Sequence, residues 1–215
     1  MSADDESQHP LQDVDLHCTI VSRAPFAGLM RSLLARASAA GWSISSLEMR
    51  DEEDEPIVGD LAGHARTRGS FDYATPTQVR RVFWSSSPRG TCCEYSGGVY
   101  IRQFAAIDED LATACERAIA EMMTLFGGPE TLCVALGWED DHAIDVGPGI
   151  VGVYRRTLGL QGGVEVPGAR IEERDDEWVE VRAELSQQGR EAAVMIQAVI
   201  AGGLARACDC EGPEA

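Results

Sequence analysis

The chain lacks lysine altogether. All 18 of its basic residues are arginine, and they stand against 36 Asp and Glu, which gives a formal net charge of -18. Without an ε-amine, the protein cannot use a Schiff-base lysine, a lysine general base or a lysine phosphate clamp. The net charge also opposes direct binding to nucleic acid and to anionic membranes. We therefore expect any macromolecular partner to be basic.

Several other signatures are missing. No P-loop of the form G-x-x-x-x-G-K-[ST] and no Gly-x-Ser-x-Gly elbow occurs, which removes the commonest sequence evidence for a phosphate cradle or a serine hydrolase. No apolar run approaches the length of a membrane span, and Met1 is followed by polar and acidic residues rather than a signal peptide. The sequence thus predicts a cytoplasmic protein without a membrane segment, and nothing in it indicates a cofactor.

The seven cysteines are irregularly spaced and odd in number. Two close pairs offer an alternative zinc site, but neither pair has the two-residue spacing usual in structural zinc sites. Odd, irregular cysteines in a protein without a signal peptide favour reduced thiols in a cytosol. We therefore predict unpaired, metal-free thiols at Cys18, Cys92, Cys93, Cys115, Cys133, Cys208 and Cys210.

Hydrophobic periodicity predicts an α+β fold built on an antiparallel sheet. Amphipathic helices are expected over 26–37 and over 107–126, where Asp108 would cap the second helix and Leu111, Ile119, Met122 and Phe126 would be buried. Alternating or β-branched segments indicate strands at 15–21, 42–49, 78–84, 95–104 and 131–136. If residues 51–76 are an irregular acidic insert, the order becomes β-α-β-β-α-β, the ferredoxin-like arrangement with both helices on one face of the sheet.

The rest of the chain extends this domain. Residues 1–13 read as a disordered tail, 14–145 as the α+β domain and 208–215 as a C-terminal tail. The segment 146–207 predicts a strand at 150–154, one or two short strands near 162–168, and a final helix that begins at Asp175-Asp176. We expect these elements to pack on the same domain as a helical extension.

One histidine carries a catalytic alternative. His17 and Thr19 lie in a His-x-Thr-hydrophobic sequence, a form that two-histidine phosphoesterases use in pairs to supply an acid, a base and phosphate-binding hydroxyls. The chain offers no second copy, because His64 and His142 lack a Thr at the matching position. The prediction is a histidine on the sheet surface, with a catalytic His17 and Thr19 as the alternative.

A metal site is the other chemical alternative. Asp140, Asp141, His142 and Asp145 follow a predicted strand and carry oxygen and imidazole ligands that suit Mg²⁺, Mn²⁺ or Zn²⁺. Carboxylate runs arise by composition in so acidic a chain, so we predict no metal here.

The sequence favours a binding or inhibitory protein that engages a basic partner without catalysis, such as an immunity protein or a DNA-mimicking inhibitor. Clustered carboxylates would speed capture of a basic surface. The alternatives are a phosphoesterase that uses His17 and Thr19, a metal-dependent hydrolase around Glu139 to Asp145, and an assembly subunit whose C-terminal apolar helix packs on a partner. The predicted partner-binding residues are Asp51, Glu52, Glu53, Asp54, Glu55, Glu139, Asp140 and Asp141.

Overall fold

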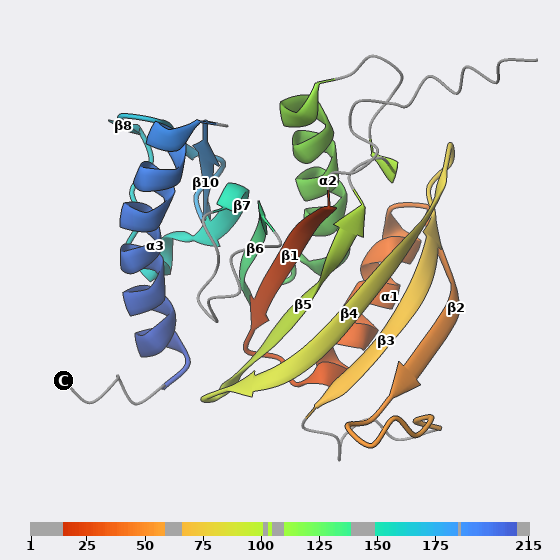
Figure 1. The fold of residues 1–215 in the computed structure, drawn as a ribbon. Helices are drawn as coiled ribbons and strands as arrows, with labels where there is room; N and C mark the ends of the chain where they lie inside the picture. The colour runs from red at the N-terminus through yellow and green to blue at the C-terminus, as the bar shows by residue number, and fades with distance from the viewer. Residues whose placement is uncertain are drawn as a thin grey trace, which may run out of the picture.

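The structure is a computed structural model that describes residues 15–58, 66–100, 103–104, 110–138, 149–184 and 186–209 (Figure 1). In its first half two helices interrupt a series of strands, and in its second half short strands precede one long helix. The elements in chain order are β1 (Asp15–Ser22), α1 (Phe26–Ala39), β2 (Ser43–Arg50), β3 (Thr67–Ala74), β4 (Val79–Arg89), β5 (Cys92–Tyr100), α2 (Leu111–Phe126), β6 (Thr131–Trp138), β7 (Gly149–Arg155), the 3₁₀ turn η2 (Arg156–Leu158), β8 (Val164–Val166), β9 (Ala169–Glu173), β10 (Trp178–Ala183) and α3 (Gln187–Ala207).

All the strands belong to one ten-stranded sheet with the order β2-β3-β4-β5-β1-β6-β7-β10-β9-β8. Every pair of neighbours is antiparallel. The N-terminal strand β1 lies inside the sheet between β5 and β6, where it joins the strands of the first half to those of the second.

The helices cover opposite faces of the two halves. Because side chains alternate along a strand, β6 contributes Val134 and Leu136 to the core under α1 and α2, and Cys133 and Ala135 to the core under α3. Figure 1 shows α1 behind the strands β2 to β5 and α3 beside the opposite end of the sheet. Among the described residues, no helix covers the face of β2, β3 and β4 that is turned away from α1, whereas the end of α3 meets the start of β5 at Cys92.

Trp84 belongs to the core under α1 and α2. It lies between glycines on both neighbouring strands, since a Cβ on Gly69 would stand 3.0 Å from the Trp84 ring and a Cβ on Gly97 would stand 1.8 Å from the Phe83 carbonyl oxygen. The indole also contacts Phe26, with ring centroids 4.6 Å apart. Glycine is needed at both positions because any side chain would collide with the adjacent strand.

The sequence-based fold class is confirmed in its coarse form, an α+β protein with a large antiparallel sheet and three helices. The ferredoxin-like arrangement is not confirmed, because the sheet has ten strands and α3 covers the second face. The segment 51–76 is not an irregular insert, since β3 occupies most of its second half and pairs with both β2 and β4.

The helix boundaries need two corrections. The cap of α2 is Asp110, whose carboxylate accepts a hydrogen bond from the Thr113 amide at 2.9 Å, and not Asp108, which lies outside the described residues. The last helix begins after Ser186, whereas Asp175 accepts amide hydrogen bonds in the turn before β10. Within α2, Ile119, Met122 and Phe126 are buried as predicted, and Leu111 is half-buried.

None of the described helices is both long enough and apolar enough to cross a membrane.

Candidate functional site

The candidate site lies on the face of the sheet that is turned away from α1 and α2, around strand β4. Along β4, the even-numbered residues Arg80 to Ser86 are buried under α1 and α2, and the odd-numbered residues face solvent. Two of the outward residues are large and apolar: Val79 is 71% exposed and Phe83 is 41% exposed. Exposed apolar residues are common on protein surfaces, so the case for an interaction surface depends on the groups that surround Phe83.

Phe83 lies in a shallow depression on this face, which we call the sheet groove. It has a volume of about 520 Å³ and spans β2 to β1 across five strands. Its lining is formed by His17, Glu48, Arg50, Arg68, Gly69, Ser70, Phe83, Trp84, Ser85, Ser96, Gly97 and Gly98.

Hydroxyls and a charged pair surround Phe83. The hydroxyls of Ser85 and Ser96 lie 3.2 Å apart across the β4–β5 pair. Arg81 donates two hydrogen bonds to the Asp72 carboxylate, at 2.7 and 3.0 Å. These bonds hold the pKa of Asp72 below its usual range, so the carboxylate stays charged and paired at neutral pH. The face around Phe83 is thus polar and close to neutral.

The chain that leaves β2 forms a compact turn over residues 51–55, which we call the acid turn. The Asp51 carboxylate accepts hydrogen bonds from the amides of Glu53 and Glu55, at 3.1 and 2.9 Å. Asp54 has a φ of 69°, a left-handed conformation that Asp tolerates better than most residues. A backbone bridge between Arg50 and Pro56 closes the turn. Hydrogen bonding therefore gives the acidic run a defined shape.

The acid turn is attached to the rim of the sheet groove by Asp54. Its carboxylate pairs with Arg68 at 2.8 Å and with Arg50 at 3.5 Å, and both arginines line the groove. Asp51 and Asp54 are therefore engaged within the protein. Glu52, Glu53 and Glu55 are exposed on this turn.

The structure brings His17 into the sheet groove but gives it no phosphate site there. Thr19 points to the same face but is only 7% exposed, and it pairs in register with Ser96. His17 lies on β1 and Arg50 on β2, which are four strand spacings apart, or roughly 19 Å at about 4.8 Å each. One phosphate group cannot contact both side chains, so the arrangement does not assemble the acid, base and clamp of a phosphoesterase.

The remaining predicted site residues lie outside the described part of the chain. These are Glu139, Asp140, Asp141, His142 and Asp145, together with His64. Within the residues that the structure describes, no group of three or more His, Cys, Asp or Glu side chains is placed to hold a metal ion. The metal alternative therefore stays a prediction.

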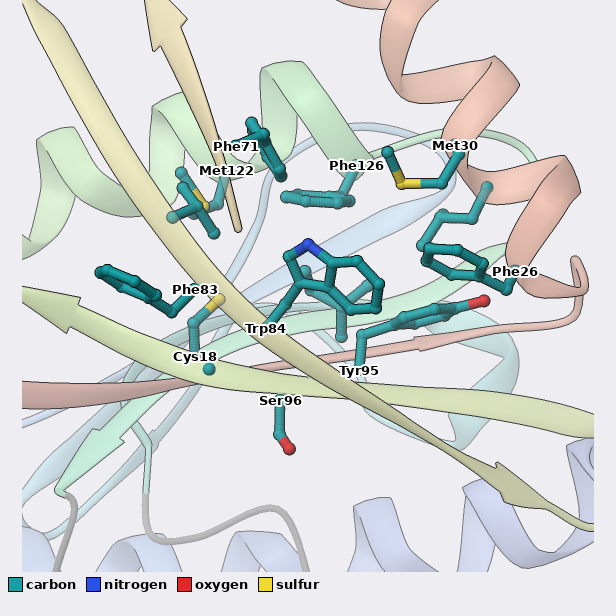
Figure 2. Close-up of a pocket in the computed structure, with 14 residues that line it drawn as sticks. Cys18, Phe26, Met30, Phe71, Phe83, Trp84, Tyr95, Ser96, Met122 and Phe126 are labelled. Carbon is teal, nitrogen blue, oxygen red and sulfur yellow. The ribbon is translucent and has the colours of Figure 1, made fainter. Parts of the chain in front are cut away.

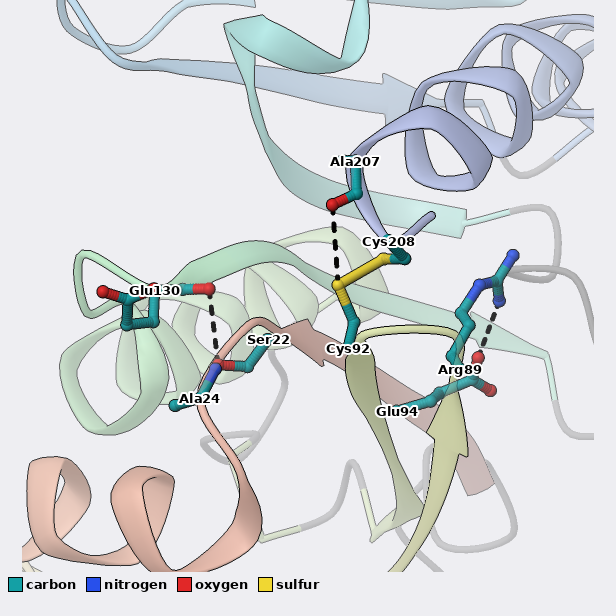
Figure 3. The surroundings of a disulfide bond; sticks show 8 residues. All are labelled: Ser22, Ala24, Arg89, Cys92, Glu94, Glu130, Ala207 and Cys208. Carbon is teal, nitrogen blue, oxygen red and sulfur yellow. Dashed lines mark hydrogen bonds and ion pairs between the residues drawn. A yellow bond between two sulfur atoms is a disulfide. The ribbon is translucent and has the colours of Figure 1, made fainter. Parts of the chain in front are cut away.

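The prediction of unpaired thiols is wrong for two cysteines. Cys92, at the start of β5, forms a disulfide with Cys208, at the end of α3, across a sequence separation of 116 residues (Figure 3). No sequence pattern indicates this bond, because the two residues meet only when α3 folds back on the β4–β5 hairpin. Disulfides are rare in the cytosol, so reduced thiols no longer support the predicted cytoplasmic location.

A small apolar cavity lies behind the sheet groove, under α1 and α2 (Figure 2). Its volume is about 20 Å³, which is room for one water molecule. Its walls include Phe26, Met30 and Met122, and the indole Nε1 of Trp84 has no hydrogen-bond partner in the described structure. The cavity is too small for an organic ligand, so we assign it to the core.

Comparison with known proteins yields no match to a family model, to a curated protein or to a solved structure. The function has to be argued from the site itself.

Sequence reasoning identified the acidic run at 51–55 as a solvated loop, but it predicted neither its hydrogen-bonded turn nor the groove beside it. One signal was available: Phe83 and Trp84 are adjacent apolar residues in a strand, so one of them has to point away from the core. The sequence does not reveal which face the helices cover, and that choice decides which of the two rings is exposed.

Proposed function

We propose that the protein is a non-catalytic binding protein that captures a basic protein segment across the sheet groove and the acid turn. Glu52, Glu53 and Glu55 would pair with arginine or lysine side chains of the partner. Phe83 would pack against the apolar stem or ring of a residue between those basic groups. The hydroxyls of Ser85 and Ser96 would accept or donate hydrogen bonds at the polar rim.

The observation that carries this proposal is that the five carboxylates of the acid turn fall into two groups, those bonded within the protein and those exposed to solvent. Two of its carboxylates hold the backbone and the rim arginines, and the other three face solvent on a turn of defined shape. Prearranged charges next to an exposed apolar residue lower the entropic cost of binding and speed encounter with an oppositely charged partner.

The test compares two sets of three neutralisations. A fluorescent peptide of alternating Arg and Ser serves as the probe, and its affinity is measured by anisotropy at low salt. We expect E52Q/E53Q/E55Q to weaken binding at least about ten-fold through lost steering and pairing, and Phe83→Ala to weaken it as well. The matched control E130Q/E165Q/D176N neutralises three exposed acids elsewhere and should change affinity less than about three-fold. Equal losses in the two sets would show that only bulk charge matters.

The phosphoesterase alternative makes the opposite prediction for His17. Under the binding proposal, His17→Ala weakens peptide binding less than Phe83→Ala does, because His17 lines the end of the sheet groove that lies four strands from β2 and the acid turn. Hydrolysis of a cyclic phosphodiester by the parent protein, lost in His17→Ala, would contradict the proposal.

A further inference from the structure

The helix α3 presents an uncharged outer face in a strongly acidic protein. Its inner side buries Ala192, Ile196, Ile200 and Leu204 against the second half of the sheet. On the outer side, Val194 is 58% exposed, Met195 is 60% exposed and Val199 is 45% exposed.

The charge pattern of this face is as marked as its apolar character. Charged residues make up 25% of the chain, yet none occurs from Ala192 to Ala205. Glu191 and Arg206 are the first charged residues at the two ends of this run, and both are exposed. Helical spacing places Glu191, Met195, Ala198 and Gly202 on one stripe, with Arg206 at its far end.

This stripe is self-complementary about its own centre. If two copies of α3 pack antiparallel, with a two-fold axis between Ala198 and Val199, Glu191 of each copy faces Arg206 of the other. The same axis sets Met195 of each copy opposite Gly202 of the other, where the absence of a side chain leaves room for it. A Cβ added at Gly202 would meet a nitrogen of the Arg206 guanidinium at 3.5 Å, an ordinary contact distance, and Arg206 is an exposed side chain that can move aside.

We propose that the outer face of α3 binds a second copy of this chain as an antiparallel, two-fold symmetric helix pair. A second copy fits the stripe in both charge and shape, because the two ends of the helix carry opposite signs. An anionic membrane does not fit, since the protein has a net charge of -18 and the uncharged stretch brings no basic residues to the surface. A single helix pair makes a small interface, so the association is weak and depends on protein concentration. The proposal is independent of the basic-partner function.

The first experiment measures molar mass by sedimentation velocity over a wide concentration range in 0.5 M NaCl. The parent protein should pass from 23.2 kDa toward twice that mass as concentration rises. Met195→Glu should weaken self-association at least about ten-fold, because it places a carboxylate in an interface that lacks charge. The control Val79→Glu adds the same charge at an exposed apolar residue of β4 and should leave self-association within about two-fold of the parent.

The second experiment tests the geometry. Arg206→Glu alone sets two carboxylates against each other and should weaken self-association about five-fold or more, and so should Glu191→Arg alone by pairing two guanidinium groups. The double variant E191R/R206E restores opposite charges at both ends and should return the affinity to within about two-fold of the parent. A parent protein that remains at 23.2 kDa at every concentration would overturn the proposal, as would equal effects of Met195→Glu and Val79→Glu, or a failure of the double variant to recover.

Discussion

At the scale of single residues, a buried ion pair fastens α2 to the sheet. Arg80 donates two hydrogen bonds to the Glu121 carboxylate, at 2.8 and 2.7 Å, and the Tyr73 hydroxyl donates a third at 2.7 Å. The Arg80 side chain is 4% exposed and that of Glu121 is 13% exposed. Burial, followed by the neighbouring carboxylate, raises the pKa of Tyr73 far above its usual value, so the phenol remains a donor.

Removing one member of this network should be costly. Glu121→Gln leaves the Arg80 guanidinium buried without its counter-charge, and we expect unfolding free energy to fall by roughly 3–5 kcal/mol. Urea denaturation followed by circular dichroism measures this. The comparison variant Asp72→Asn breaks the Arg81–Asp72 pair on the solvent-exposed face and should leave the midpoint almost unchanged, since exposed pairs contribute little. A similar loss in both variants would contradict the assignment of the first pair to the core.

Three buried thiols should make the free energy of unfolding fall as the pH becomes alkaline. Burial raises the pKa of Cys18, Cys115 and Cys133 to about 12, whereas an unfolded thiol titrates near about 8.5. The folded pKa is the higher one, so this stability is complete below about pH 8.5 and is lost as pH rises toward 12. Each thiol contributes a slope of about 1.4 kcal/mol per pH unit once the unfolded thiol is ionised.

The pH effect can be assigned by comparing slopes. Between pH 9 and 10, in excess reductant throughout, Cys115→Ala should lose stability less steeply than the parent, by about 1 kcal/mol per pH unit. Denaturant titrations at the two pH values measure both slopes. Equal slopes would mean that Cys115 ionises as readily in the folded protein as in the unfolded one.

At the scale of elements, the disulfide links two segments that are 116 residues apart in the sequence. It joins the end of α3 to the β4–β5 hairpin, where the Thr91 amide also donates a hydrogen bond to the Cys208 carbonyl oxygen at 2.7 Å. A crosslink that closes so long a loop restricts the unfolded chain and so stabilises the folded one, by an amount that grows with the logarithm of the loop length.

Counting thiols tests the disulfide directly. The oxidised protein, unfolded without reductant, should react at five of its seven cysteines, because Cys92 and Cys208 are engaged with each other. Removing the bond in C92S/C208S should lower unfolding free energy by about 2–4 kcal/mol. Titration of seven thiols would show that the pair is reduced, and a double variant as stable as the parent would show that the bond adds nothing.

Sequence reasoning succeeded where the hydrophobic pattern was local and regular. The apolar stripe of α2 and the alternation of β2 were both readable, and both elements are present. β3 was missed because its polar Arg68, Gly69 and Ser70 interrupt the pattern of a strand, and the strand is stabilised instead by pairing on both edges. The sequence predicts helix at β10 because the burial of its residues does not alternate, and four successive residues are buried. Trp178 belongs to the core under α1 and α2, and Val179 and Val181 belong to the core under α3. Glu180 is buried between them and pairs with Arg174 and Arg182.

At the scale of the whole molecule, the site was only half predictable. The run of five acids can be read directly from the sequence. Its position beside the sheet groove cannot, because it depends on the ion pair between Asp54 and Arg68 of β3, a strand that the sequence pattern does not predict. The exposure of Phe83 depends on which face α1 and α2 cover, and that of Met195 on which side of α3 meets the sheet. These are properties of the assembled layers rather than of any segment.

The two proposed surfaces should respond to salt in opposite directions. Binding of the basic peptide joins opposite charges, and the Debye length falls from about 10 Å at 0.1 M to about 3 Å at 1 M, so added salt should weaken it. Self-association brings together two molecules of charge -18 through a face that lacks charge over most of its length, so added salt should strengthen it by screening their repulsion. Anisotropy with the peptide and sedimentation of the protein alone, each over a salt series, measure the two trends.

E52Q/E53Q/E55Q should flatten the dependence of peptide affinity on salt without weakening self-association, and Met195→Glu should weaken self-association without changing peptide affinity. If either variant abolished both activities, the acid turn and the outer face of α3 would not be separate surfaces, and the assignment of one function to each would fail.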